Sequence, residues 1–346
     1  MAPIKTILRG VGPLALALLL AAALLAVSAQ AATAQASAGA PLRIVDLGTL
    51  GGCCSSAAGI NDRGEVVGSS DVGDGNNHAF LWRGGHMSDL GTLGGCCSGA
   101  TGINNRGEVV GFSNIPAGPP HAFLWRQGHM TDLGTLGGLE SFASGVNDRG
   151  EVVGSSTTTG GDTHAFLWRR GQMSDLGTLA GGTTSGAAAI NNRGQVVGSS
   201  QTGSEEGPSA FLWQRGVMIG LTTLPGATFG GAQGINDRGQ VVGFAGFPSG
   251  QSINRAFLWQ SGVATDLGTL GGGNSQAFDI NSRGQVVGWS ETIASGTEAF
   301  LWERGVMTGL GTLAGLGSQA RAINNRGEVV GDSASAEGFS RAVLWR

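Results

Sequence analysis

Tyrosine is absent from this chain of 346 residues, and its one lysine, Lys5, lies near the N-terminus. The rest of the chain therefore offers no lysine for a Schiff base and no tyrosine as a nucleophile. Charged residues are also few, at 13% of the sequence, and the formal net charge is −4. A mildly acidic chain gives no electrostatic reason to bind nucleic acid or an anionic membrane.

Long apolar runs are missing except for one, at residues 11–27, which follows two basic residues. The next small-residue triplet, Ala29-Gln30-Ala31, is typical of a signal-peptide cleavage site. We expect 1–31 to be a signal peptide, 32–42 a linker, and the mature protein to be secreted without membrane insertion. Loss of the two basic residues takes the net charge from −4 to −6. An uncleaved N-terminal anchor is the alternative, because the apolar run approaches the length of a membrane span.

The remaining sequence repeats one pattern seven times. Each copy carries a version of Ile-Asn-x-Arg-Gly, then Val-Val-Gly, then Ala-Phe-Leu-Trp. The tryptophans that mark the copies recur every 43 to 46 residues: Trp82, Trp125, Trp168, Trp213, Trp259, Trp302 and Trp345. A period of about 40–45 residues is the length of one four-stranded propeller blade.

Within one copy the pattern predicts only strands and turns. In the second copy we expect four strands, at 98–103, 108–111, 121–125 and 130–136. The Val-Val and Phe-Leu-Trp segments do not alternate with polar residues, so both faces of these strands should be buried. A propeller blade is covered on both sides by its neighbours. The sequence therefore predicts an all-β protein, a seven-bladed β-propeller over 43–346 with four strands in each blade.

The two ends of the repeat region are out of phase in a way that favours a closed ring. The region starts with a strand of the fourth type, within 43–50, and ends with a strand of the third type at Trp345. Pairing of these two strands would complete the last blade and remove an exposed sheet edge. An open β-solenoid is the rival architecture, and it would need capping repeats at both ends.

Three copies begin their third strand with His-Ala-Phe, at His78, His121 and His164. Together with the Asp-Leu-Gly-Thr-Leu-Gly-Gly and Ile-Asn-x-Arg-Gly-x-Val-Val-Gly segments, they resemble the HAF family of extracellular repeats, over essentially all of 43–346. Later copies replace the histidine with other residues: Ser209, Arg255, Glu298 and Arg341. The strand order also resembles kelch-type blades, although the kelch double glycine is absent. The resemblance implies secretion and supplies no catalytic residue.

The loops divide between two faces of the expected propeller. One face carries the short Asn-x-Arg-Gly turns, whose arginines we expect to pair with nearby acids such as Asp62 and Glu65, with an anion-binding ring as the alternative. The other face carries loops of variable length and sequence, where binding residues usually reside on a rigid scaffold.

Six residues depart from the repeat near the inner strands of copies five to seven. They are Gln233, Phe244, Phe278, Asp279, Trp289 and Arg321. We expect them to line one side of the central opening on the variable-loop face, because aromatic side chains beside polar groups suit a sugar or a peptide. The alternative is that they are drifted repeat positions that fill the axis of the ring.

The four cysteines form two adjacent pairs, Cys53-Cys54 and Cys96-Cys97, at equivalent repeat positions. In a secreted chain they are disulfide candidates, either across neighbouring blades or within each pair. A metal site and free thiols are the alternatives. The histidines fall on different blades, so we expect neither a metal site nor a catalytic cluster from them.

These observations lead to a functional expectation with two alternatives. The main expectation is a secreted, monomeric propeller without a cofactor or catalytic activity, which binds an extracellular glycan, peptide or protein through its variable loops. The first alternative is a hydrolase or lyase with its site at the central opening, for which Asp279 and Arg321 are the only hints. The second is a purely structural or adhesive exoprotein.

Overall fold

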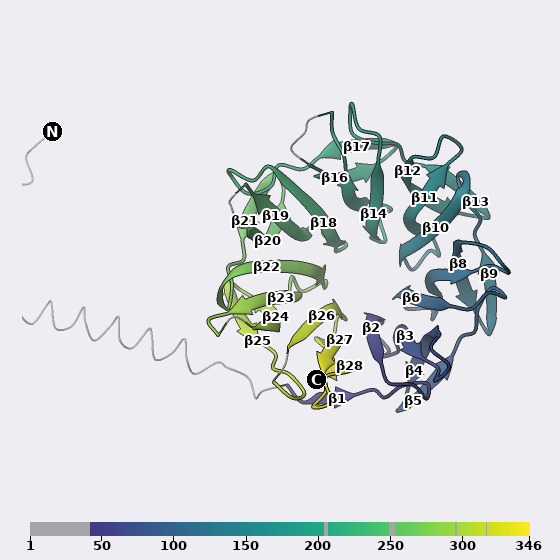
Figure 1. Cartoon of the computed structure of the whole chain (residues 1–346). Coiled ribbons are helices and arrows are strands. Elements are labelled where there is room, and N and C mark those ends of the chain that lie inside the picture. The colour runs from purple at the N-terminus through teal and green to yellow at the C-terminus, as the bar shows by residue number, and fades with distance from the viewer. Residues whose placement is uncertain (1–41, 204–206, 249–252, 295, 316) are drawn as a thin grey trace, which may run out of the picture. The chain divides into compact units, whose positions relative to one another are not determined.

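The computed structural model describes residues 42–346, except 204–206, 249–252, 295 and 316. All regular structure in these residues is β-strand, and the strands form seven four-stranded antiparallel sheets. The sheets follow one another around a ring (Figure 1). The predicted seven-bladed β-propeller is therefore confirmed.

In blades one to six, the chain runs from the innermost strand to the outermost. Blades one to three contain β2 (Ser55–Ile60), β3 (Val66–Asp71), β4 (Asn77–Arg83), β5 (His86–Asp89); β6 (Ser98–Ile103), β7 (Val109–Asn114), β8 (Pro120–Arg126), β9 (His129–Asp132); and β10 (Gly137–Val146), β11 (Val152–Thr158), β12 (Thr163–Arg169), β13 (Gln172–Asp175). Blades four to six contain β14 (Ser185–Ile190), β15 (Val196–Ser200), β16 (Ser209–Gln214), β17 (Val217–Gly220); β18 (Phe229–Ile235), β19 (Val241–Phe247), β20 (Ile253–Gln260), β21 (Val263–Asp266); and β22 (Gly271–Ile280), β23 (Val286–Thr292), β24 (Thr297–Glu303), β25 (Val306–Gly309).

Blade seven joins the two ends of the propeller. It contains β26 (Ser318–Ile323), β27 (Val329–Ala334), β28 (Ser340–Trp345) and, as its outermost strand, β1 (Ile44–Asp46). β1 runs antiparallel to β28, with Ile44 opposite Trp345. The backbone N–H of Arg43 also donates to the carbonyl oxygen of Arg346 at 2.8 Å. The predicted closure by the N-terminal strand is confirmed.

The hydrophobic core is divided into clusters between neighbouring blades. Between blades two and three, for example, Leu124 packs with Val152 and Phe166. The expectation of burial on both faces is correct for the phenylalanine of the third strand, which has no exposed surface in blades one to six. Six of the repeat tryptophans instead remain half-buried at the outer edge of their clusters, while Trp345 is fully buried.

The glycine that follows each Val-Val pair lets two strands of one blade approach closely. A Cβ atom at Gly68 would lie 2.0 Å from the carbonyl oxygen of Ser56 on the inner strand. The equivalent glycines of the other six blades meet the same obstacle at 1.9–2.0 Å. Any side chain here would therefore push the second strand away from the first.

The strand directions give the ring two different faces. We call the face with the Asn-x-Arg-Gly turns and the hairpins between third and fourth strands the turn face. The opposite face, with the loops between second and third strands and the links between blades, is the variable face.

Candidate functional site

Each turn on the turn face is built around one asparagine. In blade one, Oδ1 of Asn61 accepts hydrogen bonds from the backbone N–H groups of Arg63 at 3.0 Å and Glu65 at 3.1 Å. Its Nδ2 donates to Oε2 of Glu65 at 2.6 Å and to the carbonyl oxygen of Asn104 in the next blade at 3.1 Å. The buried amide therefore has its two acceptor and two donor positions satisfied.

The contact between neighbouring asparagines is repeated around the whole propeller. Each turn asparagine donates from Nδ2 to the carbonyl oxygen of the next at 2.9–3.1 Å. The members of this asparagine ring are Asn61, Asn104, Asn147, Asn191, Asn236, Asn281 and Asn324. The ring fixes the inner ends of all seven blades to one another.

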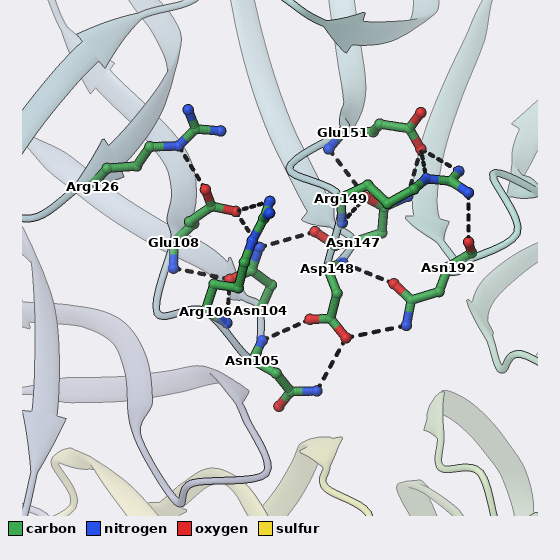
Figure 2. Close-up of polar contacts among 10 residues, drawn as sticks. All are labelled: Asn104, Asn105, Arg106, Glu108, Arg126, Asn147, Asp148, Arg149, Glu151 and Asn192. Atoms are coloured by element: carbon green, nitrogen blue, oxygen red, sulfur yellow. Dashed lines mark hydrogen bonds and ion pairs between the residues drawn. The ribbon is translucent and has the colours of Figure 1, made fainter.

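A second ring lies beside the asparagine ring, at the residue after each turn asparagine. Aspartate and asparagine alternate over most of it: Asp62, Asn105, Asp148, Asn192 and Asp237, then Ser282 and Asn325. Each backbone N–H donates to the side-chain oxygen of the next member, as Asn105 does to Asp148 at 2.8 Å (Figure 2). Among the described contacts the exception is the step from Asp237 to Ser282, where the alternation ends at the shorter serine side chain.

The turn arginines pair with glutamates in four of the seven blades. Arg63 contacts Glu65 at 2.6 Å, and the same pair recurs in blades two, three and seven at 2.5–2.9 Å. A second arginine, from the end of the third strand, reaches the same carboxylate, as Arg126 does with Glu108 at 2.8 Å (Figure 2). The expectation of arginines paired with nearby acids is correct for these four blades.

Glu65 illustrates the electrostatics of these pairs. Its burial acts to raise the pKa of the carboxyl group, but the hydrogen bonds from Asn61 and Arg63 and the charges of Arg63 and Arg83 outweigh it. The net result is a lowered pKa. Glu65 is therefore an ionised structural group and a poor proton donor at neutral pH.

The inner ends of the turns surround a cavity of about 230 Å³ on the axis of the ring. Every blade contributes the last residue of its inner strand, its turn asparagine and the residue that follows. Asp279 is the one further residue that lines the cavity. The asparagine amides already bond one another, and Asp62, Asp148 and Asp237 accept hydrogen bonds from their neighbours in the second ring. Asp279 is therefore the one lining carboxylate that stands outside both rings.

Asp279 stands where the other blades have only glycine or alanine. The equivalent residues are Gly59, Gly102, Gly145, Ala189, Gly234 and Ala322. Oδ1 of Asp279 accepts the N–H of Ile280 at 2.8 Å, and Oδ2 accepts the N–H of Ile323 in blade seven at 2.9 Å. Burial nevertheless raises the pKa of this carboxyl group from 3.8 to about 6, because desolvation outweighs the two hydrogen bonds.

The six residues expected to line one opening on the variable face do not form a single group. The expectation is wrong for Asp279, which lies in the cavity of the turn face because it is the penultimate residue of β22, beside the turn. The guanidinium of Arg321 lies over the ring of Phe278, 4.8 Å from its centre. It also approaches Asp332, with Nε 3.4 Å from Oδ1.

The other three residues lie on β18, β19 and β23. Phe244 packs against Phe229 of its own blade, with ring centres 6.5 Å apart. Trp289 lies on β23 opposite Gln276, and Gln233 lies at the bulge of β18. The ligand-binding role predicted for the six remains a prediction. The asparagine ring was missed, although the alternation of aspartate and asparagine after the turn residue could have revealed neighbouring contacts.

Of the two cysteine pairs, the first adopts the within-pair disulfide and the second is not bonded. Cys53 and Cys54 form a disulfide with each other. Sγ of Cys96 lies 2.7 Å from Sγ of Cys97, as two free thiols. The pairs precede the inner strands of blades one and two, on the variable face.

The three His-Ala-Phe histidines have a structural partner. Nδ1 of His78 contacts Oδ2 of Asp89 at 2.8 Å, and His121 and His164 make the same contact in blades two and three. Arg255 takes this role in blade five, with Asp266. No group of three or more His, Cys, Asp or Glu residues suited to a metal ion occurs in the described part of the chain. A search of the same residues finds no helix with the length and hydropathy of a membrane span.

Comparison with known proteins gives structural neighbours but no family. No family model and no curated protein matches the sequence. The propeller domain of the Trilobed protease from Pyrococcus furiosus superposes with a TM-score of 0.55 at 10% identity, over 84% of this chain and 95% of that one. A puromycin-hydrolysing peptidase from Mycobacterium tuberculosis superposes with a TM-score of 0.55 at 12% identity, over 89% of this chain and 55% of that one. A puromycin hydrolase complexed with PGG gives 0.50 at 13% identity, over 84% and 53%.

These neighbours correct the main functional expectation. The chain was expected to be a binding or scaffold propeller without catalytic activity, and that expectation is wrong, because propellers of hydrolytic enzymes are among the structures it resembles. The chain spans about half the length of the two puromycin-hydrolysing proteins. At such low identity the likeness itself shows the fold alone, so the enzyme alternative must be argued from this chain's own residues.

Proposed function

We propose that this chain is a propeller enzyme of the hydrolase or lyase class, with its site in the turn-face cavity and Asp279 as the proton-transferring group. The observation that carries the proposal is the position of Asp279. At the position before the last residue of the inner strand, the other six blades have glycine or alanine, and only blade six has a side chain with a functional group. A carboxylate placed there costs desolvation free energy, and such costs are concentrated at functional sites.

The geometry of Asp279 suits general acid–base chemistry. Its two oxygens are each fixed by one backbone N–H, which holds the carboxylate in place and leaves lone pairs for a substrate proton. A pKa of about 6 allows the group to accept a proton at neutral pH and return it later in the reaction. Asp237 lines the same cavity from the adjacent blade and supplies a second carboxylate.

The test is a comparison of turnover in two matched variants. Chromogenic esters, glycosides, aminoacyl amides and uronate polymers are screened with the wild type, and any activity found is measured in Asp279→Ala and Asp62→Asn. Alanine occurs at the first position in blades four and seven, and asparagine occurs at the second in blades two, four and seven. We expect Asp279→Ala to lose roughly 100-fold or more in kcat, as for loss of a general acid or base. Asp62→Asn should stay near wild type. Full activity in Asp279→Ala would refute the assignment.

Family and location are proposed on sequence grounds. The repeat motifs support membership of the HAF repeats, and the apolar N-terminal run supports secretion of a monomer after removal of 1–31. Native mass spectrometry of the protein recovered from culture medium tests secretion, removal of 1–31 and the monomeric state. A chain that keeps its first 31 residues and stays with the membrane would favour the anchor.

A further inference from the structure

The turn arginines of blades four to six differ from those of the other blades. In blades one, two, three and seven, the residue two positions after the arginine is a glutamate that pairs with it. In blades four, five and six that residue is Gln195, Gln240 or Gln285. The glutamine keeps the hydrogen bond from the turn asparagine, at 2.7–2.8 Å, but brings no negative charge.

A second exchange accompanies the first. The third-strand arginine that also contacts the glutamate, Arg83 in blade one, is replaced by Gln214 in blade four and Gln260 in blade five. Nε2 of Gln195 donates to Oε1 of Gln214 at 3.0 Å, and Gln240 and Gln260 repeat this bond at 3.0 Å. In blades four and five a neutral amide pair thus replaces a glutamate–arginine pair, and in blade six the third-strand position is Glu303, which forms no ion pair with Arg283 among the described residues.

Three guanidinium groups therefore lack a carboxylate partner. Arg193, Arg238 and Arg283 are exposed and form no ion pair with any acidic residue in the described part of the chain. In blade one, Nη2 of Arg63 lies over the turn of blade two, 2.6 Å from where a Cβ atom of Gly107 would be. Arg193 and Arg238 do not occupy the equivalent places over the next turns, where glutamine atoms are the nearest neighbours, whereas Arg283 does, with Nη2 2.6 Å from where a Cβ atom of Gly327 would be.

These arginines lie in the turns of three consecutive blades, outside the lining of the cavity. Their turns contribute Asn191, Asn236 and Asn281 to the cavity lining, and Asp279 belongs to the same blade as Arg283. Acidic residues end strands on the opposite face, as Asp71, Asp89 and Asp175 do, whereas Glu303 is the one acidic residue that ends a described strand on the turn face. An anionic group would therefore be attracted to the unpaired arginines of the turn face, while the cavity itself is lined by carboxylates such as Asp237 and Asp279.

We propose that Arg193, Arg238 and Arg283 bind successive carboxylate groups of an acidic polysaccharide across the turn face, beside the cavity. The inference rests on the proposed function, since it names the substrate class of the same site. A carboxylate is the group that the turn arginines bind in the other four blades, and a guanidinium matches it with two parallel hydrogen bonds. A stiff polymer with regularly spaced charges suits three sites at regular blade spacing, because it loses less conformational entropy on binding than a flexible acidic peptide.

The proposal is tested by binding of polygalacturonate to the full-length secreted protein. The test variant is Arg193→Gln with Arg238→Gln and Arg283→Gln. The matched control, Arg106→Gln with Arg149→Gln and Arg326→Gln, removes the same charge from arginines that already have glutamate partners. A second variant, Gln195→Glu with Gln240→Glu and Gln285→Glu, supplies the missing carboxylates from within the chain. Unchanged melting temperatures show that each variant is folded.

We expect the Kd for polygalacturonate to rise roughly tenfold or more in the test variant and in the glutamate variant, and less than about threefold in the control. Equal losses in test and control variants, or no binding at about 50 mM salt, would overturn the proposal. Tighter binding of poly-glutamate than of polygalacturonate would also overturn it. Asp279→Ala should bind polygalacturonate as the wild type does. A wrong catalytic assignment would therefore appear in the turnover of Asp279→Ala, whereas a wrong binding site would appear in the Kd of the arginine variant.

Discussion

Nδ2 of Asn324 donates a hydrogen bond of 3.1 Å to the carbonyl oxygen of Asn61, across 263 residues of sequence. This bond closes the asparagine ring at the same junction where β1 pairs with β28 at the outer edge of blade seven. The propeller is thus closed twice, once near its axis by side-chain amides and once at its rim by a strand. The two closures are chemically independent, and each can be broken separately.

The asparagine ring should contribute measurably to stability. Asn104→Ala removes the hydrogen bond to Asn147 and the two bonds that Oδ1 accepts within its own turn. We expect the free energy of unfolding to fall by about 2–4 kcal/mol, because buried backbone donors lose their acceptor. Urea unfolding measures the change. Asn105→Ala, at the exposed neighbouring position, is the control and should cost less than about 1 kcal/mol. Equal losses in the two variants would contradict a special role for the inner ring.

Closure by β1 can be tested through Trp345. Deletion of residues 43–50 removes the strand opposite Trp345 and the buried Leu47 that packs in the same blade. The melting temperature should fall by at least several degrees, since an unpaired sheet edge and apolar surface become exposed. Tryptophan fluorescence should also shift to longer wavelength, because Trp345 is fully buried in the closed ring. An unchanged melting temperature would contradict a role for β1 in closing the ring.

Asp279 should make the protein less stable as the pH rises. Its pKa is about 6 in the folded protein and 3.8 as a reference, so between these values the folded state holds a proton that the unfolded chain releases. The contribution of Asp279 to the free energy of unfolding is thus lost as the pH rises from about 4 to about 6. As the pH rises through that window, the free energy of unfolding of Asp279→Ala should increase by on the order of 2–3 kcal/mol relative to that of the wild type. Urea unfolding at several pH values measures this difference, and a constant difference would contradict the raised pKa.

The glutamate and third-strand arginine should behave as a coupled pair. Glu65→Gln alone leaves Arg63 and Arg83 without their carboxylate, whereas Glu65→Gln with Arg83→Gln recreates the amide pair of blade four. We expect the double variant to recover about 0.5–1 kcal/mol of the loss seen in Glu65→Gln, a modest amount because Arg83 is largely exposed. A double-mutant cycle of unfolding free energies measures it. Simple additivity would show that the two exchanges are unrelated.

The pH dependence of Glu65 runs opposite to that of Asp279. Its pKa is lowered, so its contribution to stability is present above the ordinary glutamate pKa and is lost as the pH falls through the lowered value. The wild type is therefore expected to lose stability in acid through its glutamate–arginine pairs while Asp279 becomes protonated. Comparison of Glu65→Gln with wild type at decreasing pH separates the two contributions.

The sequence by itself determined the blade count, the strand order and the closing strand. Strand patterns such as Val-Val-Gly and Ala-Phe-Leu-Trp are local, and a ring of blades places each copy in the same surroundings. The burial of Phe80 could therefore be predicted from one copy and carried to the five other blades that keep the phenylalanine, while blade seven has Val343 at this position. The pairing of Arg63 with an acid could also be predicted from the sequence, because its partner lies two residues further along the chain.

Only the tertiary structure decided what the side chains at the axis do. Asn61 bonds Asn104 because the inner ends of neighbouring blades meet, and no local pattern reports which atoms meet across 43 residues of sequence. Asp279 was expected on the variable face, yet the end of β22 carries it into the turn-face cavity, where desolvation changes its chemistry. The sequence marked where the repeat departs from itself. The fold decided which departures share one cavity, because that depends on contacts between blades.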